Sequence, residues 1–188
     1  LDLSGSVSAD SFADLTKIVE NNQVAFGNQY TWSSYNPTTR KVIYTQKADK
    51  LTIMDGSSQI IFTINANDQV VSYEQIYAGS VQVLGKEREL ITAQKAVEIL
   101  YLAGRISSKA TVQSVKLSYY QSLVLKDFSI YSPAWYIEIR QADGQLIARR
   151  VDAIHGTVLA NETLETTNTQ TQRTTTNNTT TTQSVQQQ

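Results

Sequence analysis

The chain has 188 residues, of which 40% are hydrophobic and 18% charged, a composition that suits one ordinary domain or two small ones with a buried core. It carries 16 basic and 17 acidic residues, so the basic surface that nucleic acid requires is missing and we expect no nucleic-acid partner. The absence of cysteine excludes disulfides, thiol nucleophiles and thiolate metal sites.

The sequence contains no run of about 20 apolar residues that could span a membrane, and no charged-then-apolar signal sequence opens it. Two interpretations follow. Either the protein is soluble, or a membrane anchor was removed before Leu1. A first residue other than Met favours the second interpretation.

The first half of the chain predicts one helix followed by short strands. Apolar residues recur at spacings of three and four over residues 7–22, which indicates an amphipathic helix with Ser8 as its N-cap. Asp55-Gly56 is a turn pair that is typical of hairpins. Aromatic and β-branched content predicts strands at residues 30–35, 41–47, 51–54, 59–64 and 69–76.

A second helix is predicted after a charged connector at residues 84–89. Thr92 is its expected N-cap and Gly104 its expected end. Apolar alternation resumes at residues 110–120, and another apolar segment follows at residues 123–130. The apolar side of the helix is expected to consist of Ala96, Val97, Leu100 and Ala103.

The stretch 131–158 organises the second half. Trp135, Ile137 and Ile139 alternate with polar residues, the period of a strand with one buried face. We expect Pro133 at the entry to this strand, where its missing N–H does little harm.

Two turns are predicted downstream. Asp143-Gly144 supplies adjacent residues that tolerate positive φ, so the chain is expected to reverse in a two-residue primed turn and to return as a strand at residues 146–151. The run from Asp152 to Gly156 is expected to turn the chain once more.

Helix followed by antiparallel strands thus occurs twice. We predict an α+β fold of two small units, residues 1–84 and 85–160, each with a helix packed on an antiparallel β-sheet. A single merged sheet is the rival arrangement. Residues 161–188 are Thr-, Asn- and Gln-rich with almost no aliphatic side chains, and we expect a disordered tail.

His155 is the only histidine, and it follows Asp152 by three positions. A catalytic interpretation makes it a general base oriented by Asp152, whereas the structural interpretation is a turn between two strands. The structural interpretation is favoured, because no serine nucleophile or second metal ligand is placed around the pair.

The other carboxylate pairs, Asp10 with Asp14 and Glu87 with Glu89, are typical of solvated surfaces. Glycine-rich phosphate loops, nucleophile elbows and zinc-protease helices are missing from the sequence. We therefore predict no enzyme, with no catalytic, cofactor-binding or metal-binding residue, no cofactor and no assignable partner surface.

Ten tyrosines offer a different lead. Exposed tyrosines on a sheet are favoured in protein interfaces, whereas tyrosine is also simply a good strand residue. The candidates beside expected core positions are Tyr30, Tyr35, Tyr73, Tyr77, Tyr120 and Tyr136.

Three segments, at residues 92–100, 115–120 and 131–137, resemble the second half of the YycI family when they are read together. The order of helix, strand pair, proline-aromatic strand, Asp-Gly hairpin and Asp-x-x-x-Gly turn is also similar to a PepSY-type module. For the first half, the resemblance lies in architecture and length only.

The resemblance implies a non-enzymatic extracytoplasmic domain that follows one transmembrane helix. It further implies a complex with a YycH-type regulator and a WalK-type sensor histidine kinase, whose activity the complex adjusts. Homodimer formation stays open. The alternative, of a different class, is an exported PepSY-like module that inhibits a peptidase or binds a cell-wall ligand.

Overall fold

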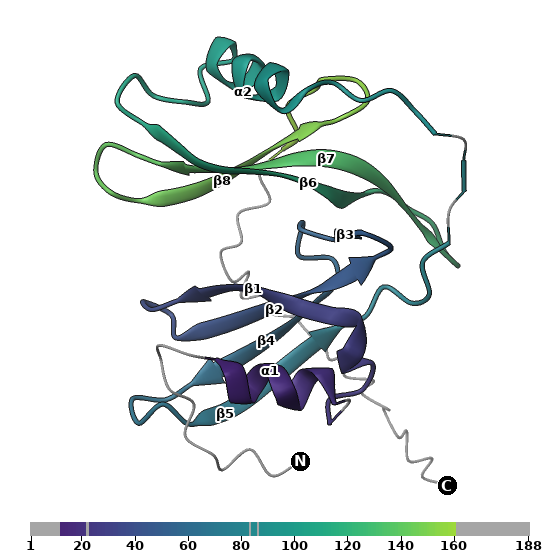
Figure 1. Ribbon diagram of the computed structural model, residues 1–188, viewed down its shortest axis with the longest axis vertical. Helices are drawn as coiled ribbons and strands as arrows, with labels where there is room; N and C mark the ends of the chain where they lie inside the picture. Colours follow the sequence, from purple (N-terminus) through teal and green to yellow (C-terminus); the bar gives the residue numbers. More distant parts are fainter. Residues whose placement is uncertain (1–11, 22, 83, 86, 161–188) are drawn as a thin grey trace, which may run out of the picture.

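The computed structural model describes residues 12–21, 23–82, 84–85 and 87–160 (Figure 1). In the described residues the fold is α+β, with two antiparallel sheets and two α-helices, and the strands contain far more residues than the helices. The elements in chain order are α1 (Ala13–Glu20), the 3-10 turn η1 (Gly27–Gln29), β1 (Tyr30–Asn36), β2 (Lys41–Ala48), β3 (Leu51–Thr52), β4 (Gln59–Ile64), β5 (Val70–Ile76), α2 (Ala93–Leu102), β6 (Thr111–Val124), β7 (Ser129–Arg140) and β8 (Leu146–Asp152).

The first sheet has the strand order β1-β2-β4-β5, with β3 attached to β2. Helix α1 packs on one face of it, where Leu15 and Val19 join a core cluster with strand residues such as Tyr44 and Phe62. Thr16 and Tyr44 add a hydrogen bond of 2.9 Å between their hydroxyls. Helix α1 begins at Ala13 in the described chain, and the predicted cap Ser8 lies outside the described residues.

The second sheet has the order β6-β7-β8. Ala96 and Leu100 of α2 are fully buried against Ile137, Ile139 and Val151, as the apolar spacing predicted. Figure 1 shows the two helices on the outer faces of the pair of sheets.

The ends of α2 match the prediction except at one position. The Thr92 hydroxyl accepts a hydrogen bond from the Lys95 amide at 3.1 Å, and Gly104 has a positive φ of 67° just beyond the helix. Ala103 is exposed, so its expected place on the apolar side was wrong, because the helix ends at Leu102 and the chain turns outward there.

The predicted strand pair around Asp143-Gly144 forms, but the turn differs. Gly144 has a φ of 86°, and Asp143 does not have a positive φ. The Gly144 amide donates to the Gln141 carbonyl at 2.9 Å and the Gln141 amide donates to the Gln145 carbonyl at 2.8 Å. This pattern is a three-residue loop, so the two-residue primed turn was wrong.

Pro133 lies inside β7, opposite Tyr119 of β6, and not at the strand entry. Its carbonyl accepts a hydrogen bond from the Ala153 amide at 2.9 Å. The backbone of Pro133 therefore faces the residue that directly follows the end of β8 at Asp152. The missing N–H therefore costs little, because β8 leaves the sheet at this level.

The hairpin predicted around Asp55-Gly56 was also wrong. Strand β4 pairs with β2 and β5, and the short β3 pairs with β2. Ile53 instead forms an isolated parallel bridge with Tyr119 of β6. The two sheets are therefore separate but joined at one point, which is neither a merged sheet nor two unconnected units.

No helix among the described residues is long and apolar enough to cross a membrane. The predicted tail at residues 161–188 lies outside the part of the chain that the structure describes. The division at residues 84 and 85 stays a prediction.

Candidate functional site at the junction of the two sheets

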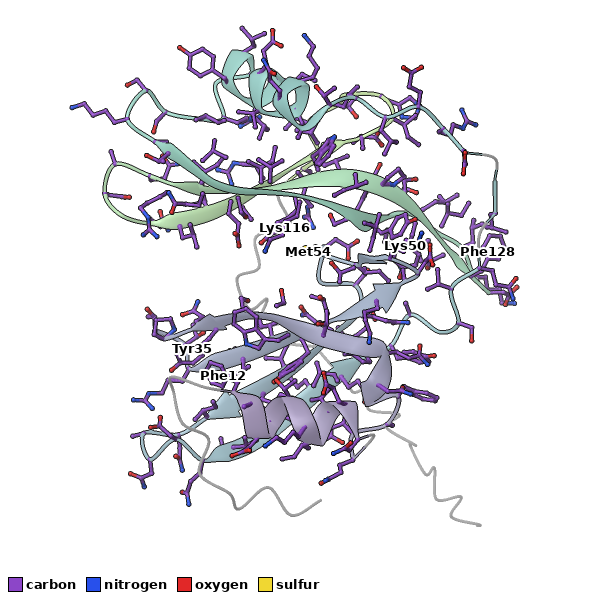
Figure 2. The ribbon with its side chains drawn as sticks, viewed as in Figure 1. Phe12, Tyr35, Lys50, Met54, Lys116 and Phe128 are labelled. Carbon is purple, nitrogen blue, oxygen red and sulfur yellow. The ribbon has the colours of Figure 1, made fainter. Side chains whose placement is uncertain are left out.

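The junction consists of the segment 53–55 and the strands of the second sheet that it contacts. Ile53 is fully buried. The Met54 amide donates to the Tyr119 carbonyl at 3.0 Å, and Arg150 Nη1 donates to the Met54 carbonyl at 3.3 Å. Figure 2 shows Met54 between the two sheets. The short segment 53–55, which follows β3 of the first sheet, is thus hydrogen-bonded to strands of the second sheet.

The Asp55 carboxylate fixes this segment from both sides. Its Oδ1 accepts hydrogen bonds from the Ser57 amide at 2.9 Å and the Ser57 hydroxyl at 2.6 Å. Its Oδ2 accepts a hydrogen bond from the Gln121 amide on β6. One side chain therefore closes its own turn and bonds to the other sheet, because a carboxylate can accept several donors at once.

Beside the junction, Asp152 is a buried carboxylate with four donors around it. It is 4% exposed. Oδ1 accepts from the Ile154 amide at 2.8 Å, the His155 amide at 2.7 Å and His155 Nδ1 at 3.1 Å. Oδ2 accepts from the Tyr120 hydroxyl at 2.7 Å. Ala134 lies on β7 between β6 and β8, directly opposite Ser118 on one side and Asp152 on the other.

The electrostatics of Asp152 follow from this arrangement. Burial by itself raises the pKa of the carboxyl, but the hydrogen bonds from the His155 amide, the Tyr120 hydroxyl and the Ile154 amide outweigh burial, and the net pKa lies below its usual value. Asp152 is therefore ionised, and its negative charge is stabilised by the four hydrogen bonds that its carboxylate accepts.

The structure brings Asp152 and His155 together as predicted, and their geometry supports the turn interpretation. The His155 side chain is 70% exposed. The nearby serine hydroxyls are engaged elsewhere, since Ser118 donates to the Ala134 carbonyl at 3.1 Å and Ser132 donates to Ser122 at 2.8 Å. The pair holds the turn that leads the chain from β8 back to Val158.

The other predicted carboxylate pairs form no site. Asp14 makes an exposed ion pair with Lys17 at 3.1 Å, and Asp10 lies outside the described residues. Glu87 and Glu89 are exposed on the connector. Within the described ranges, no group of three His, Cys, Asp or Glu residues could hold a metal ion.

The tyrosines are mostly not the exposed interface residues of the first interpretation. Tyr30 is 1% and Tyr136 is 7% exposed, so both are core residues. Tyr35 packs its ring 4.9 Å from Phe12. Tyr77 stacks on Phe26 with ring centroids 4.4 Å apart.

Two candidate tyrosines remain, and they have different environments. Tyr120 belongs to the junction through Asp152. Tyr73 is 40% exposed, with its ring 5.7 Å from Phe62. Tyr73 is therefore the only one of the six that keeps a large free surface in the described structure.

Alkaline titration should reveal the buried tyrosines. Burial, the hydrogen bond to Asp152 and its charge raise the pKa of Tyr120 to about 12, and burial with the charge of Glu138 raises the pKa of Tyr136 to about 12. Because the folded pKa exceeds the unfolded value, the contribution to stability is complete below about pH 10 and is lost as the pH rises toward about 12. We expect tyrosinate absorbance in two steps, the later one coinciding with unfolding. Tyr136→Phe should reduce the later step, and an unchanged step would contradict this assignment.

The comparison with known proteins agrees with the resemblance drawn from the second half of the sequence, and extends it. A family model described as YycI protein matches residues 4–154, which include strands of both sheets and the junction between them. No curated protein matches the chain. The family consists of regulators of the WalK kinase system. The chain belongs to the YycI family.

Proposed function

We propose that this protein is the extracytoplasmic part of a membrane-anchored accessory regulator, which adjusts a WalK-type sensor histidine kinase through protein contacts alone. The observation that carries the proposal is the family match over residues 4–154, which spans both sheets. The proposed partners are a YycH-type regulator and the kinase itself. The proposed anchor is a transmembrane helix outside this chain.

The junction favours a mechanism in which a change in the position of one unit is transmitted to the other. Residues 12–82 and 87–160 act in our proposal as two units, each a helix on an antiparallel sheet. The segment 53–55 links them through backbone and side-chain hydrogen bonds to β6 and β8. A partner that binds one unit can then bias the position of the other.

The energy required is modest. Coupling between two sites is typically about 1–3 kcal/mol, and a net hydrogen bond contributes about 0.5–1.5 kcal/mol. The few bonds of the junction are therefore enough to transmit a binding event to an anchor helix beside the kinase.

Asp55→Ala in the anchored protein should weaken kinase regulation without unfolding either unit. The substitution removes the acceptor of the Gln121 amide, which is the side-chain link to β6. Asp143→Ala is the matched control, because Asp143 also caps its own turn, through the Gln145 amide at 2.9 Å, and lies in the loop between β7 and β8, outside the segment 53–55.

The measurement is the phosphorylation of the kinase in cells that carry each variant, with circular dichroism of the purified chains as the fold control. We expect Asp143→Ala to regulate like the parent protein and Asp55→Ala to shift kinase phosphorylation toward the level of cells without the regulator. Equal regulation by both variants would exclude transmission through the junction.

A further inference from the structure

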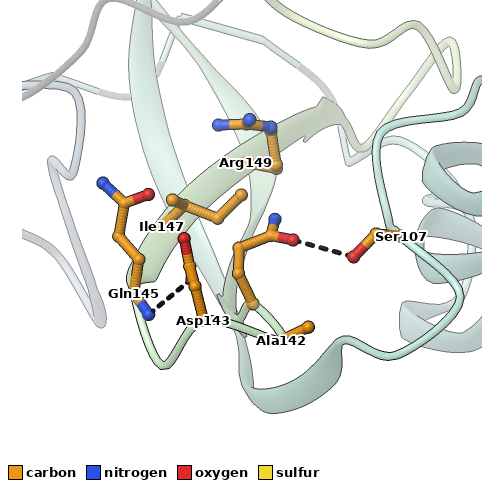
Figure 3. A pocket seen from close by; sticks show the side chains of 7 residues that line it. Ser107, Ala142, Asp143, Gln145, Ile147 and Arg149 are labelled. Atoms are coloured by element: carbon orange, nitrogen blue, oxygen red, sulfur yellow. Dashed lines mark hydrogen bonds between the residues drawn. The ribbon is translucent and has the colours of Figure 1, made fainter.

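An open pocket of about 370 Å³ lies where β7 turns into β8 at one end of the second sheet (Figure 3). Its lining includes Gln141 and Asp143 from the connecting loop, Ile147 and Arg149 from β8, and Ser107 from the segment that follows α2. Ile147 packs against the core cluster that α2 covers. Arg149 lies on the same face of β8, because it is two residues further along the strand.

The guanidinium of Arg149 has one edge that is bonded and one that is not. Its Nη1 donates to the Ala148 carbonyl at 2.9 Å, whereas its Nε is buried and has no hydrogen-bond partner in the described structure. Among the described residues no carboxylate forms an ion pair with Arg149. Nε and Nη2 together form the edge that can bind a carboxylate through two parallel hydrogen bonds. A buried donor without an acceptor is costly, so an oxyanion gains more at this edge than at a solvated arginine.

Positive charge prevails around the pocket. Burial and, secondarily, the charge of Arg105 lower the pKa of the Arg149 guanidinium, so the two cations lie close enough to repel each other. The one carboxylate among the described lining residues is Asp143, which accepts a hydrogen bond from the Gln145 amide at 2.9 Å. Asp143 offsets one of the two cations, and the remaining positive charge attracts an anion.

Gln141 supplies a second hydrogen-bond donor. Its Oε1 accepts a hydrogen bond from the Ser107 hydroxyl at 2.8 Å, which fixes the orientation of the side-chain amide. The Nε2 of the same amide carries two hydrogens and is left to donate to a ligand. The lining thus offers a guanidinium edge and an amide nitrogen at the rim of an apolar core.

A carboxylate fits these donors better than a phosphate. The planar guanidinium edge matches a carboxylate in shape, whereas phosphate sites are typically built from backbone amides at a helix N-terminus or a loop nest. The helix nearest in sequence to the lining residue Ser107 is α2, which ends at Leu102 and so presents its C-terminus. Ala142 and Ile147 are apolar lining residues, so the ligand is expected to carry a short apolar group beside its carboxylate.

We propose that this pocket binds a carboxylate, with the Nε–Nη2 edge of Arg149 as its main contact and Gln141 Nε2 as a second donor. A small rotation of the Arg149 side chain suffices to present the covered Nε to the ligand. The free C-terminus of a peptide and the side chain of an acidic residue present the same chemistry. The site is separate from the proposed kinase regulation, because its lining contains no residue of the segment 53–55.

Three small probes test the site in the 188-residue chain at constant ionic strength. N-acetylalanine carries a terminal carboxylate, aspartate blocked at both backbone ends carries a side-chain carboxylate, and N-acetylalaninamide is the neutral control. Nitrogen-15 NMR follows the Arg149 Nε–H and the Gln141 side-chain amide. We expect both signals to shift and saturate with a carboxylate probe and to stay in place with the neutral amide. The carboxylate that binds more tightly identifies the source of the ligand.

Substitutions separate this site from general attraction by positive charge. Arg149→Gln should weaken binding of the carboxylate at least about tenfold, because the charged donor pair is lost, and Arg149→Lys should restore only part of it. Gln141→Ala should weaken binding severalfold and leaves the guanidinium in place. The matched control is Arg140→Gln, since Arg140 is an exposed cation of the same hairpin that donates to the Gly144 carbonyl at 3.4 Å and does not line the pocket.

The remaining signals of the same spectra report whether each variant keeps its fold. Equal shifts with the neutral amide, carboxylate titrations that do not saturate, or equal weakening by Arg149→Gln and Arg140→Gln would overturn the proposal. Should Arg149→Gln disturb the fold, full binding by Gln141→Ala together with full binding by Arg149→Lys would overturn it as well.

Discussion

Asp152→Ala should lower the free energy of unfolding by about 3 kcal/mol, because it leaves the Tyr120 hydroxyl and two backbone amides without their acceptor inside the protein. Chemical denaturation of the purified chain measures this loss. Asp14→Ala is the matched control, since Asp14 makes only an exposed ion pair, and it should change stability by well under about 1 kcal/mol.

The pH dependence of the same variant gives an independent check. The folded pKa of Asp152 lies below its usual value, so its contribution to stability is present above the unfolded pKa and is lost as the pH falls through the folded pKa. The parent protein should therefore lose stability in acid more steeply than Asp152→Ala. Parallel acid unfolding curves, or a neutral-pH loss no larger than that of Asp14→Ala, would refute the role given to this carboxylate.

Gly27→Ala should be comparably harmful, for a steric reason. A Cβ at Gly27 would lie 2.1 Å from the Val19 carbonyl oxygen and 3.0 Å from its carbonyl carbon. Both are backbone atoms of α1, so no side-chain rotation can relieve the clash. Helix α1 must shift away from its sheet, and overpacking of this kind costs about 3 kcal/mol.

Gly85→Ala provides the control for that prediction. A Cβ there meets nothing within 4 Å, and Gly85 is not among the glycines with positive φ. Thermal unfolding followed by circular dichroism should give a midpoint near that of the parent protein for Gly85→Ala and a much lower one for Gly27→Ala. Similar midpoints for the two variants would show that α1 does not pack as described.

Local sequence signals predicted the elements that depend on nearby residues. Thr92 and Gly104 mark the ends of α2 because capping is a contact within a few residues. Asp152 to Gly156 form the predicted turn for the same reason, since the carboxylate accepts the amides that follow it.

Asp55-Gly56 shows where such signals fail. The pair resembles Asp143-Gly144 in sequence, but the Asp55 carboxylate bonds to the Gln121 amide on a strand far along the chain, and Ile53 pairs with Tyr119. Nothing within the local window indicates either partner. The junction, and with it the candidate site, therefore depends on a long-range contact that a single sequence does not reveal.

The exposure of the tyrosines was hard to predict for a related reason. Tyr136 follows Trp135 on β7 and belongs to the opposite face, which the one-sided pattern assigns to solvent. That face is covered because Arg150, directly opposite Tyr136, reaches the Met54 carbonyl of the junction. When a sheet is covered on both faces, residues such as tyrosine are buried at positions that an alternating apolar pattern alone would assign to solvent.

The most direct test of the account reconstitutes the WalK-type kinase in vesicles and measures its autophosphorylation with the anchored regulator, and separately with the 188-residue chain added in solution. The anchored protein should change the rate and co-purify with the kinase, and the free chain should leave the rate unchanged. Regulation by the free chain, or an anchored protein that neither binds the kinase nor alters its rate, would contradict control by contact through a coupled anchor.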